Sequence, residues 1–175
     1  MKTVYLFRHG DSEESGLVRD YCRKLTEEGV LRSEAMADHL NKSGYRPDLI
    51  ITSGALRAKS TADIIAKHLN YPGSDIVIED VLYETKKPED VIPLLLNSSS
   101  NISSIMIVGH NPLLSDFIKY ISRPPVEINM KKSSVVQIDF KTKEWNSITP
   151  ASGKIVFYKT FEKGKIIDCS TTAQG

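Results

Sequence analysis

Short runs of apolar residues alternate along the chain with stretches in which apolar residues recur every three or four positions. The first pattern is typical of strands buried in a sheet, and the second is typical of amphipathic helices. Four apolar runs are predicted strands, at residues 3–7, 49–52, 76–78 and 102–108. Their alternation with helical stretches predicts one α/β domain that extends over residues 1–175.

Helical spacing is clearest in the two segments that follow the first two predicted strands. The first helix is expected to start after Thr26, whose side chain can cap it, and to end at Gly44. Its apolar residues Leu31, Ala35 and Leu40 are expected to share one face. The second helix also has apolar residues at helical spacing. They are Ala58, Ala62, Ile65, Ala66 and Leu69.

The second half of the chain continues the alternation less regularly. The segment 88–96 has helical character, but Pro93 would interrupt an interior turn, so a helix there must be short or kinked. Helical spacing returns at 113–121. From Ser133 onward, apolar and polar residues alternate with a period of two, which predicts strands or hairpins that complete the sheet.

Composition and charge narrow the classes of partner. Hydrophobic residues make up 40% of the 175 residues and charged residues 26%, values that are ordinary for a globular protein. There are 23 Lys and Arg against 22 Asp and Glu, which gives a formal net charge of +1. This balance argues against a nucleic-acid partner or binding to a membrane surface, where one sign should dominate. Any anion must be held by a few well-placed cations.

The subcellular location is predicted from the number and spacing of the cysteines and from the first residues of the chain. Cys22 and Cys169 are the only cysteines, and neither belongs to a metal-ligand or redox motif. We interpret them as two thiols, with a disulfide as the alternative. The first apolar run is too short for a signal peptide, and no run approaches the length of a membrane helix. We therefore expect a cytoplasmic protein.

Three predicted strands run directly into polar clusters. Residues 8–10 are Arg-His-Gly, residues 53–57 contain Ser53 and Arg57, and residues 109–111 are Gly-His-Asn. Ligands bind beyond the carboxyl ends of the strands in open parallel sheets, so we expect these clusters to meet at one edge. Two arginines and two histidines would then surround one anion, and a phosphoryl group fits this combination best.

Each of these residue types suits phosphoryl transfer. The guanidinium groups of Arg8 and Arg57 remain charged and can each bind two phosphate oxygens. The nitrogen of a neutral imidazole can attack phosphorus and leave again near neutral pH. A second imidazole, if protonated, can donate a hydrogen bond to the transferring group. These arguments alone leave open whether His9 or His110 is the nucleophile.

Four motifs resemble those of the histidine phosphatase superfamily, the phosphoglycerate-mutase-like clan, and they occur in that family's order. They are Arg8-His9-Gly10, similar to its RHG signature; Leu25-Thr26 with Gly29, similar to LTxxG; residues 53–62, similar to SPxxRAxxTA; and Gly109-His110-Asn111-Pro112, similar to GHNP. The resemblance covers residues 1 to 121. One departure is Gly54 in place of the usual proline, which should loosen the turn without changing its charge.

The resemblance implies both a fold and a division of roles. The implied fold is a three-layer α/β/α arrangement with a central, mostly parallel sheet. His9 would be the phosphorylated nucleophile, and Arg8, Arg57 and His110 would complete the phosphate pocket, with no metal and no cofactor. Asp11, in the loop after His9, is expected to be solvated rather than to orient that loop.

The short chain and the Arg23-Lys24-Leu25-Thr26 segment look most like the phosphohistidine phosphatase (SixA) branch of this family. Such an enzyme would accept a phosphorylated partner protein. Because a protonated imidazole is a good leaving group, a dedicated general acid matters less than it does for an alcohol ester. Glu84 resembles the position that supplies the proton donor in other branches, and it can equally be a solvated carboxylate of its loop.

Four functions from different classes therefore stay open. The first is a phosphohistidine phosphatase, and the second is a phosphatase for small phosphorylated metabolites, in which Glu84 would act as the acid. A mutase is disfavoured, because keeping a phosphorylated donor requires a more enclosed pocket. A phosphate-binding pseudophosphatase is disfavoured too, because binding alone does not require a nucleophile such as His9.

Overall fold

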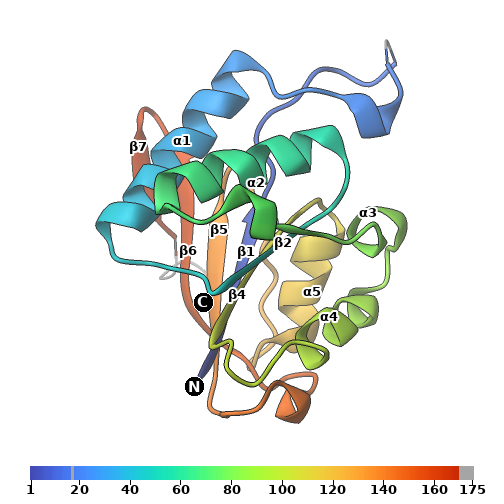
Figure 1. The fold of residues 1–175 in the computed structure, drawn as a ribbon, viewed down its shortest axis with the longest axis vertical. Helices are drawn as coiled ribbons and strands as arrows, with labels where there is room; N and C mark the ends of the chain where they lie inside the picture. The colour runs from blue at the N-terminus through green and yellow to red at the C-terminus, as the bar shows by residue number, and fades with distance from the viewer. Residues whose placement is uncertain (17, 170–175) are drawn as a thin grey trace.

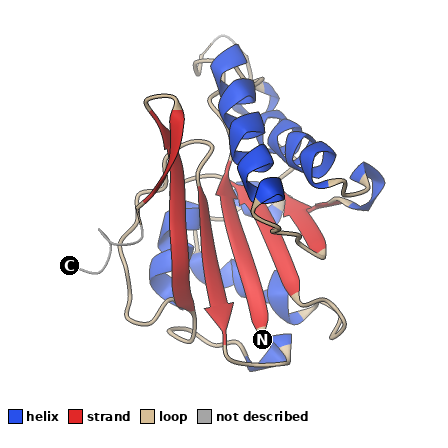
Figure 2. Cartoon of the chain, turned by 90° about the vertical axis from the view of Figure 1, so that its left-hand side faces the viewer, coloured by secondary structure: helices blue, strands red, loops and turns tan. Residues whose placement is uncertain are grey.

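The computed structural model of the protein describes residues 1–16 and 18–169, which form one seven-stranded sheet with helices on both faces (Figures 1 and 2). The strands are β1 (Lys2–Arg8), β2 (Leu49–Thr52), β3 (Val77–Ile78), β4 (Ser104–Gly109), β5 (Val135–Phe140), β6 (Lys154–Glu162) and β7 (Lys165–Asp168). The α-helices are α1 (Glu27–Lys42), α2 (Leu56–Leu69), α3 (Val81–Glu84), α4 (Ile92–Leu96) and α5 (Leu113–Ile121). Residues 17 and 170–175 of the expected domain lie outside the described part.

The strand order is β3-β2-β4-β1-β5-β6-β7. The first four strands in this order are parallel to one another, whereas β5, β6 and β7 are joined by antiparallel pairing. The expected three-layer α/β/α fold is therefore confirmed, with a parallel core and an antiparallel extension at one side. Strand β4 lies between β1 and β2, although it follows both of them in the chain.

Alternation along the central strands assigns side chains to two cores. Val4 and Leu6 of β1 pack with α5 and the short helices α3 and α4. Tyr5 and Phe7 point to the opposite face and pack with α1 and α2. Each fully buried side chain of this kind stabilises the fold by about 1.5–3 kcal/mol. Both faces are covered, as a parallel sheet requires.

Helix α1 starts as predicted but buries a different face. The Thr26 hydroxyl accepts a hydrogen bond from the Gly29 amide at 3.0 Å, which caps the helix. The prediction that Leu31 shares the buried face with Leu40 is wrong, because Leu31 is 65% exposed. Met36 and Ala37 are buried beside Leu40 instead, because the direction of packing against α2 and the sheet sets the buried face.

Pro93 limits the helical segment that contains it, as predicted. The structure has a 3₁₀ turn at Pro88–Val91 followed by the five-residue helix α4. None of the helices in the described part of the chain combines the length and apolar character that a membrane span needs.

Candidate active site

The polar clusters that follow β1, β2 and β4 lie next to one another at the carboxyl edge of the sheet. The His9 amide donates to the Gly109 carbonyl at 3.1 Å, and the Ser53 amide donates to the Val108 carbonyl at 3.1 Å. Because β4 is the middle strand, His110 lies between His9 on one side and Ser53 on the other.

His9 is held with one ring nitrogen available for chemistry. Its side chain is buried, and Nδ1 lies 2.7 Å from the carbonyl oxygen of Gly10, which can only accept a hydrogen bond. Nδ1 therefore carries the proton, and Nε2 has the lone pair that accepts a long hydrogen bond, 3.4 Å, from Arg57 Nε. Burial, followed by the charges of His110, Arg57 and Arg8, holds the pKa of His9 well below its usual value, although the Gly10 contact opposes this shift. The ring is neutral at pH 7, as a nucleophile must be.

His110 lies against His9, with 4.8 Å between the ring centroids. Its Nε2 is 2.6 Å from the Ser53 hydroxyl, and its buried Nδ1 has no hydrogen-bond partner among the described residues. Burial first, and then the Arg57 charge, lower the pKa of His110 to about 3. The ring is therefore neutral at pH 7, and a bound phosphoryl dianion would favour its protonation.

Arg57 is 5% exposed and is oriented by two groups. While Nε faces His9, Nη1 donates to the main-chain oxygen of Asp20 at 2.6 Å and Nη2 to its carboxylate at 3.0 Å. The carboxylate oxygen that binds Nη2, Asp20 Oδ2, also accepts a hydrogen bond from the Tyr83 hydroxyl at 3.0 Å. The edge of Tyr83 packs on His110, with 5.7 Å between the rings. Asp20 and Tyr83 are therefore parts of the site.

Ser53 lies at this edge of the sheet as expected, because it follows β2 directly and belongs to the same polar cluster as Arg57. The sequence did not indicate Asp20 or Tyr83 as site residues. Asp20 lies in a 3₁₀ turn, Asp20–Cys22, far in sequence from Arg57 and Tyr83, so no local pattern marks it.

Arg8 ends β1 and directly precedes His9 in the chain. Its Nη1 donates to the Met130 carbonyl at 2.5 Å, and its buried Nε has no partner among the described residues. Arg8 lies close enough to His9 and His110 that its positive charge helps to lower the pKa of both rings. Burial in turn lowers the pKa of Arg8.

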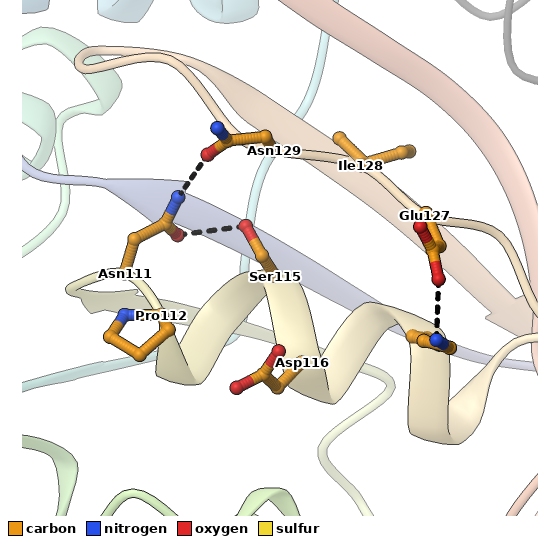
Figure 3. Close-up of a pocket in the computed structure, with 8 residues that line it drawn as sticks. Asn111, Pro112, Ser115, Asp116, Glu127, Ile128 and Asn129 are labelled. Carbon is orange, nitrogen blue, oxygen red and sulfur yellow. Dashed lines mark hydrogen bonds and ion pairs between the residues drawn. The ribbon is translucent and has the colours of Figure 1, made fainter.

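Residues that line a groove at the start of α5 connect Asn111 to the loop at residues 127–129 (Figure 3). The Asn111 amide donates to Asn129 at 3.0 Å and to the Met130 carbonyl at 3.1 Å. Ser115 donates to the Asn111 side-chain oxygen and accepts from the Met130 amide. Asn111, from the motif that contains His110, thus positions the carbonyl to which Arg8 is bound.

The loop after His9 is fixed against the start of α1. The Asp11 carboxylate forms an ion pair with Lys132 and accepts a hydrogen bond from the Thr26 hydroxyl at 3.4 Å. Gly29 lets the main chain of Asp11 lie this close to α1, because a Cβ at residue 29 would lie 2.1 Å from the Asp11 carbonyl oxygen. Asp11, which was expected to be solvated, therefore orients the loop that follows His9.

Gly54, where the family has proline, lies under the Asp20–Cys22 turn. A Cβ at this position would lie 2.0 Å from the Tyr21 hydroxyl, which donates to the Asp80 carboxylate at 2.9 Å. The Tyr21 ring also packs edge-on against Tyr83, with centroids 5.0 Å apart. Gly54 thus provides the space in which the turn carrying Asp20 contacts the rest of the site.

Glu84 lies at the exposed end of α3. Its carboxylate forms no hydrogen bond or ion pair with any residue that the structure describes, and its neighbour Tyr83 is the residue that packs against His110. The structure brings His9, Arg57 and His110 into contact with Arg8 nearby, but it does not bring the Glu84 carboxylate into this contact. In residues 1–16 and 18–169 no group of three or more His, Cys, Asp or Glu side chains is arranged to hold a metal ion.

The lowered pKa values of the two site histidines predict a loss of stability in acid. The unfolded chain takes up protons at each histidine near pH 6.5, whereas the folded chain keeps His9 and His110 neutral to lower pH. The free energy of unfolding should therefore fall as pH decreases below about 6.5, by up to about 1.4 kcal/mol per pH unit for each histidine. Urea denaturation between about pH 7 and pH 5 checks this slope. A His110→Gln variant should show a shallower slope, and an unchanged slope would contradict the assignment.

Comparison with known proteins agrees with this geometry. Residues 4–87 match the model of the histidine phosphatase superfamily (branch 1). The chain is 30% identical to the phosphohistidine phosphatase SixA of Escherichia coli over 115 residues, which are 63% of this chain and 68% of SixA.

Solved structures share the fold. A protein histidine phosphatase SixA complexed with tungstate is 21% identical, with a TM-score of 0.79 over 90% of this chain and 96% of that one. A mycobacterial glucosyl-3-phosphoglycerate phosphatase is 14% identical, with a TM-score of 0.66 over 97% and 99% of the two chains. The four motifs in order, their meeting at one sheet edge and the likeness to SixA lead to one conclusion: the chain belongs to the histidine phosphatase superfamily and is a phosphatase.

Proposed function

We propose that this phosphatase removes the phosphoryl group from a phosphohistidine on a partner protein, with His9 as the nucleophile. The observation that carries the proposal is the arrangement of His9, whose Nδ1 is bound to Gly10 and whose Nε2 lone pair faces Arg57 Nε. A phosphoryl group that entered between these two nitrogens would meet the nucleophile and a cation together. Arg8 and His110 border the same space and would share the negative charge.

The reaction has two steps. In the first, a bond forms between His9 Nε2 and phosphorus, and the bond from phosphorus to the substrate nitrogen breaks, leaving its electron pair on the departing imidazole. In the second, water attacks phosphorus, the His9–phosphorus bond breaks, and inorganic phosphate is released. The two guanidinium groups neutralise charge in both steps, which is the main requirement of a loose phosphoryl-transfer transition state.

The state of the carboxylates favours an imidazole leaving group over an alcohol. Asp20 is the only carboxylate hydrogen-bonded to any of Arg8, His9, Arg57 and His110 in the described part of the chain. Burial would raise the pKa of Asp20, but hydrogen bonds from Tyr83 and Arg57 lower it, so this group is ionised and is a poor general acid. A leaving imidazole that already carries a proton needs no such acid.

A small-molecule phosphomonoesterase is the second candidate. The fold is shared with a phosphatase of a phosphorylated metabolite, and Glu84 adjoins Tyr83, which faces His110. A movement of α3 that brought Glu84 to the leaving oxygen would supply the missing acid. A cytoplasmic location also belongs to the proposal, and fractionation of cells that express the tagged chain checks it.

The two candidates are separated by assaying a histidine-phosphorylated protein and a panel of phosphomonoesters side by side, with a chelator present throughout. We expect kcat/KM to be at least about 100-fold higher for the phosphohistidine protein, because protonated imidazole leaves without an acid. Glu84→Gln should leave that activity within about twofold of the unchanged protein, and Glu89→Gln provides the matched control of an exposed carboxylate. Faster turnover of an ester, or its selective loss in Glu84→Gln, would favour the second candidate.

A further inference from the structure

The Asp20 carboxylate occupies an unusual position for a site that binds an anion. Its Oδ2 lies 3.0 Å from Arg57 Nη2 and 3.0 Å from the Tyr83 hydroxyl, while its Oδ1 lies 2.9 Å from Arg23 Nη2. The side chain is nevertheless 45% exposed, so it can contact a ligand that enters from solvent. A fixed, partly exposed negative charge therefore lies next to Arg57, on the solvent side of the site.

Asp20 does not use all of the hydrogen-bonding capacity of Arg57. It occupies Nη1 through its main-chain oxygen and one hydrogen of Nη2 through its carboxylate. Nε and the second hydrogen of Nη2 lie on the edge of the guanidinium that faces His9. A phosphoryl group bound at His9 can thus share Arg57 with Asp20, which places two anions on one cation.

The position of Asp20 is built into the fold. The neighbouring Tyr21 hydroxyl is bound by Asp80, and it fits only because residue 54 is glycine. Arg23, three residues further on, pairs with the same carboxylate. These contacts, from the middle of the turn and from the residue that follows it, hold the carboxylate beside Arg57.

A carboxylate here has opposite effects on the two substrate classes. It repels the dianion of a phosphomonoester, whose leaving group has no positive charge to offset the repulsion. A phosphohistidine whose ring is protonated presents a cationic N–H group beside its phosphoryl group. That group can donate a hydrogen bond to the carboxylate, so the same charge attracts this substrate.

We propose that Asp20 is a specificity-determining residue that selects phosphohistidine by accepting a hydrogen bond from the protonated imidazole and by repelling phosphomonoesters. The inference rests on the proposed function and names how the same site chooses its substrate. As His9 Nε2 bonds to phosphorus, the bond from phosphorus to the substrate nitrogen breaks and its electron pair stays on that nitrogen. The imidazole leaves neutral, with its proton on the nitrogen that faces Asp20.

The test is an Asp20→Asn variant, which keeps one oxygen acceptor for Arg57 and Tyr83 and loses the charge together with the acceptor that pairs with Arg23. The matched control is Asp63→Asn, which removes a charge from an exposed residue of α2 that is not hydrogen-bonded to Arg57, Asp20 or Tyr83. For each protein, kcat/KM is measured on a histidine-phosphorylated protein and on p-nitrophenyl phosphate, together with the inhibition constant of inorganic phosphate.

In Asp20→Asn we expect the preference for phosphohistidine over p-nitrophenyl phosphate to fall at least about tenfold and inorganic phosphate to bind several-fold tighter. Asp63→Asn should change each value by less than about twofold. A parallel loss on both substrates with weaker phosphate binding would overturn the inference, because Asp20 would then only position Arg57. An unchanged preference would overturn it as well. A wild-type protein that is inactive on phosphohistidine would overturn the proposed function and the inference together.

Discussion

Replacement of His9 by alanine is expected to lower kcat by at least about 10,000-fold, because the covalent route to products disappears with the nucleophile. The expectation follows from the orientation of the ring, in which Gly10 holds the Nδ1 proton and leaves Nε2 to attack. Binding should be retained, since the arginines that hold the phosphoryl group remain.

The decisive measurement is the phosphorylated enzyme itself. Rapid quenching of the wild-type protein with a radiolabelled substrate should trap an acid-labile, alkali-stable phosphohistidine, and the His9→Ala variant should trap none. His68→Ala is the control, because His68 lies in α2 and makes no contact with the site histidines. A labelled His9→Ala protein, or phosphate release at the wild-type rate, would show that another residue is attacked.

Replacement of Arg57 by lysine is expected to lower kcat/KM at least about 100-fold, although the positive charge is kept. Arg57 uses its planar fork to contact His9 through Nε and Asp20 through both Nη atoms, and a lysine ammonium cannot serve both directions. Hydrogen bonds to charged groups contribute about 1.5–3 kcal/mol each, so the loss of two accounts for a change of this size.

Steady-state kinetics and inhibition by vanadate check the Arg57 prediction. Both kcat/KM and vanadate binding should weaken, since the transition state and its analogue use the same fork. Arg46→Lys is the control, because Arg46 is exposed and its guanidinium donates to Asn41 and to the Tyr45 carbonyl rather than to a site residue. Wild-type activity in Arg57→Lys would mean that only the charge at this position matters.

The likeness to SixA concerns the family and the type of reaction, whereas the side chains around His9 and Arg57 concern the choice of substrate. The family and the phosphatase chemistry follow from the likeness to SixA of Escherichia coli, and the solved structures show that the fold is shared. We propose that the preference among phosphorylated substrates depends on Asp20, with Glu84 as the residue that the second candidate function would require. A selective role for Asp20 predicts a preference for phosphohistidine, whereas a role for Glu84 as general acid predicts turnover of phosphomonoesters. The Asp20→Asn and Glu84→Gln variants distinguish these two outcomes.

The sequence by itself determined the strands, the long helices and the residues that follow each strand. Buried strands and amphipathic helices have different apolar periods, so the pattern places Arg8, His9, Arg57 and His110 at strand ends or at the start of a helix. Parallel strands present their carboxyl ends at one edge, which is why residues about a hundred positions apart could be expected to meet.

Only the tertiary structure decided which other residues join them. The insertion of β4 between β1 and β2 places His110 next to both His9 and Ser53, and strand order is a long-range property that no local pattern encodes. The turn that brings Asp20 to Arg57 depends on packing between Tyr21, Tyr83 and Gly54. Apolar periodicity indicates which side chains are buried in a regular element, but it does not indicate where a polar loop packs. The sequence therefore could not predict that the ring of Tyr83, rather than the carboxylate of Glu84, packs against His110.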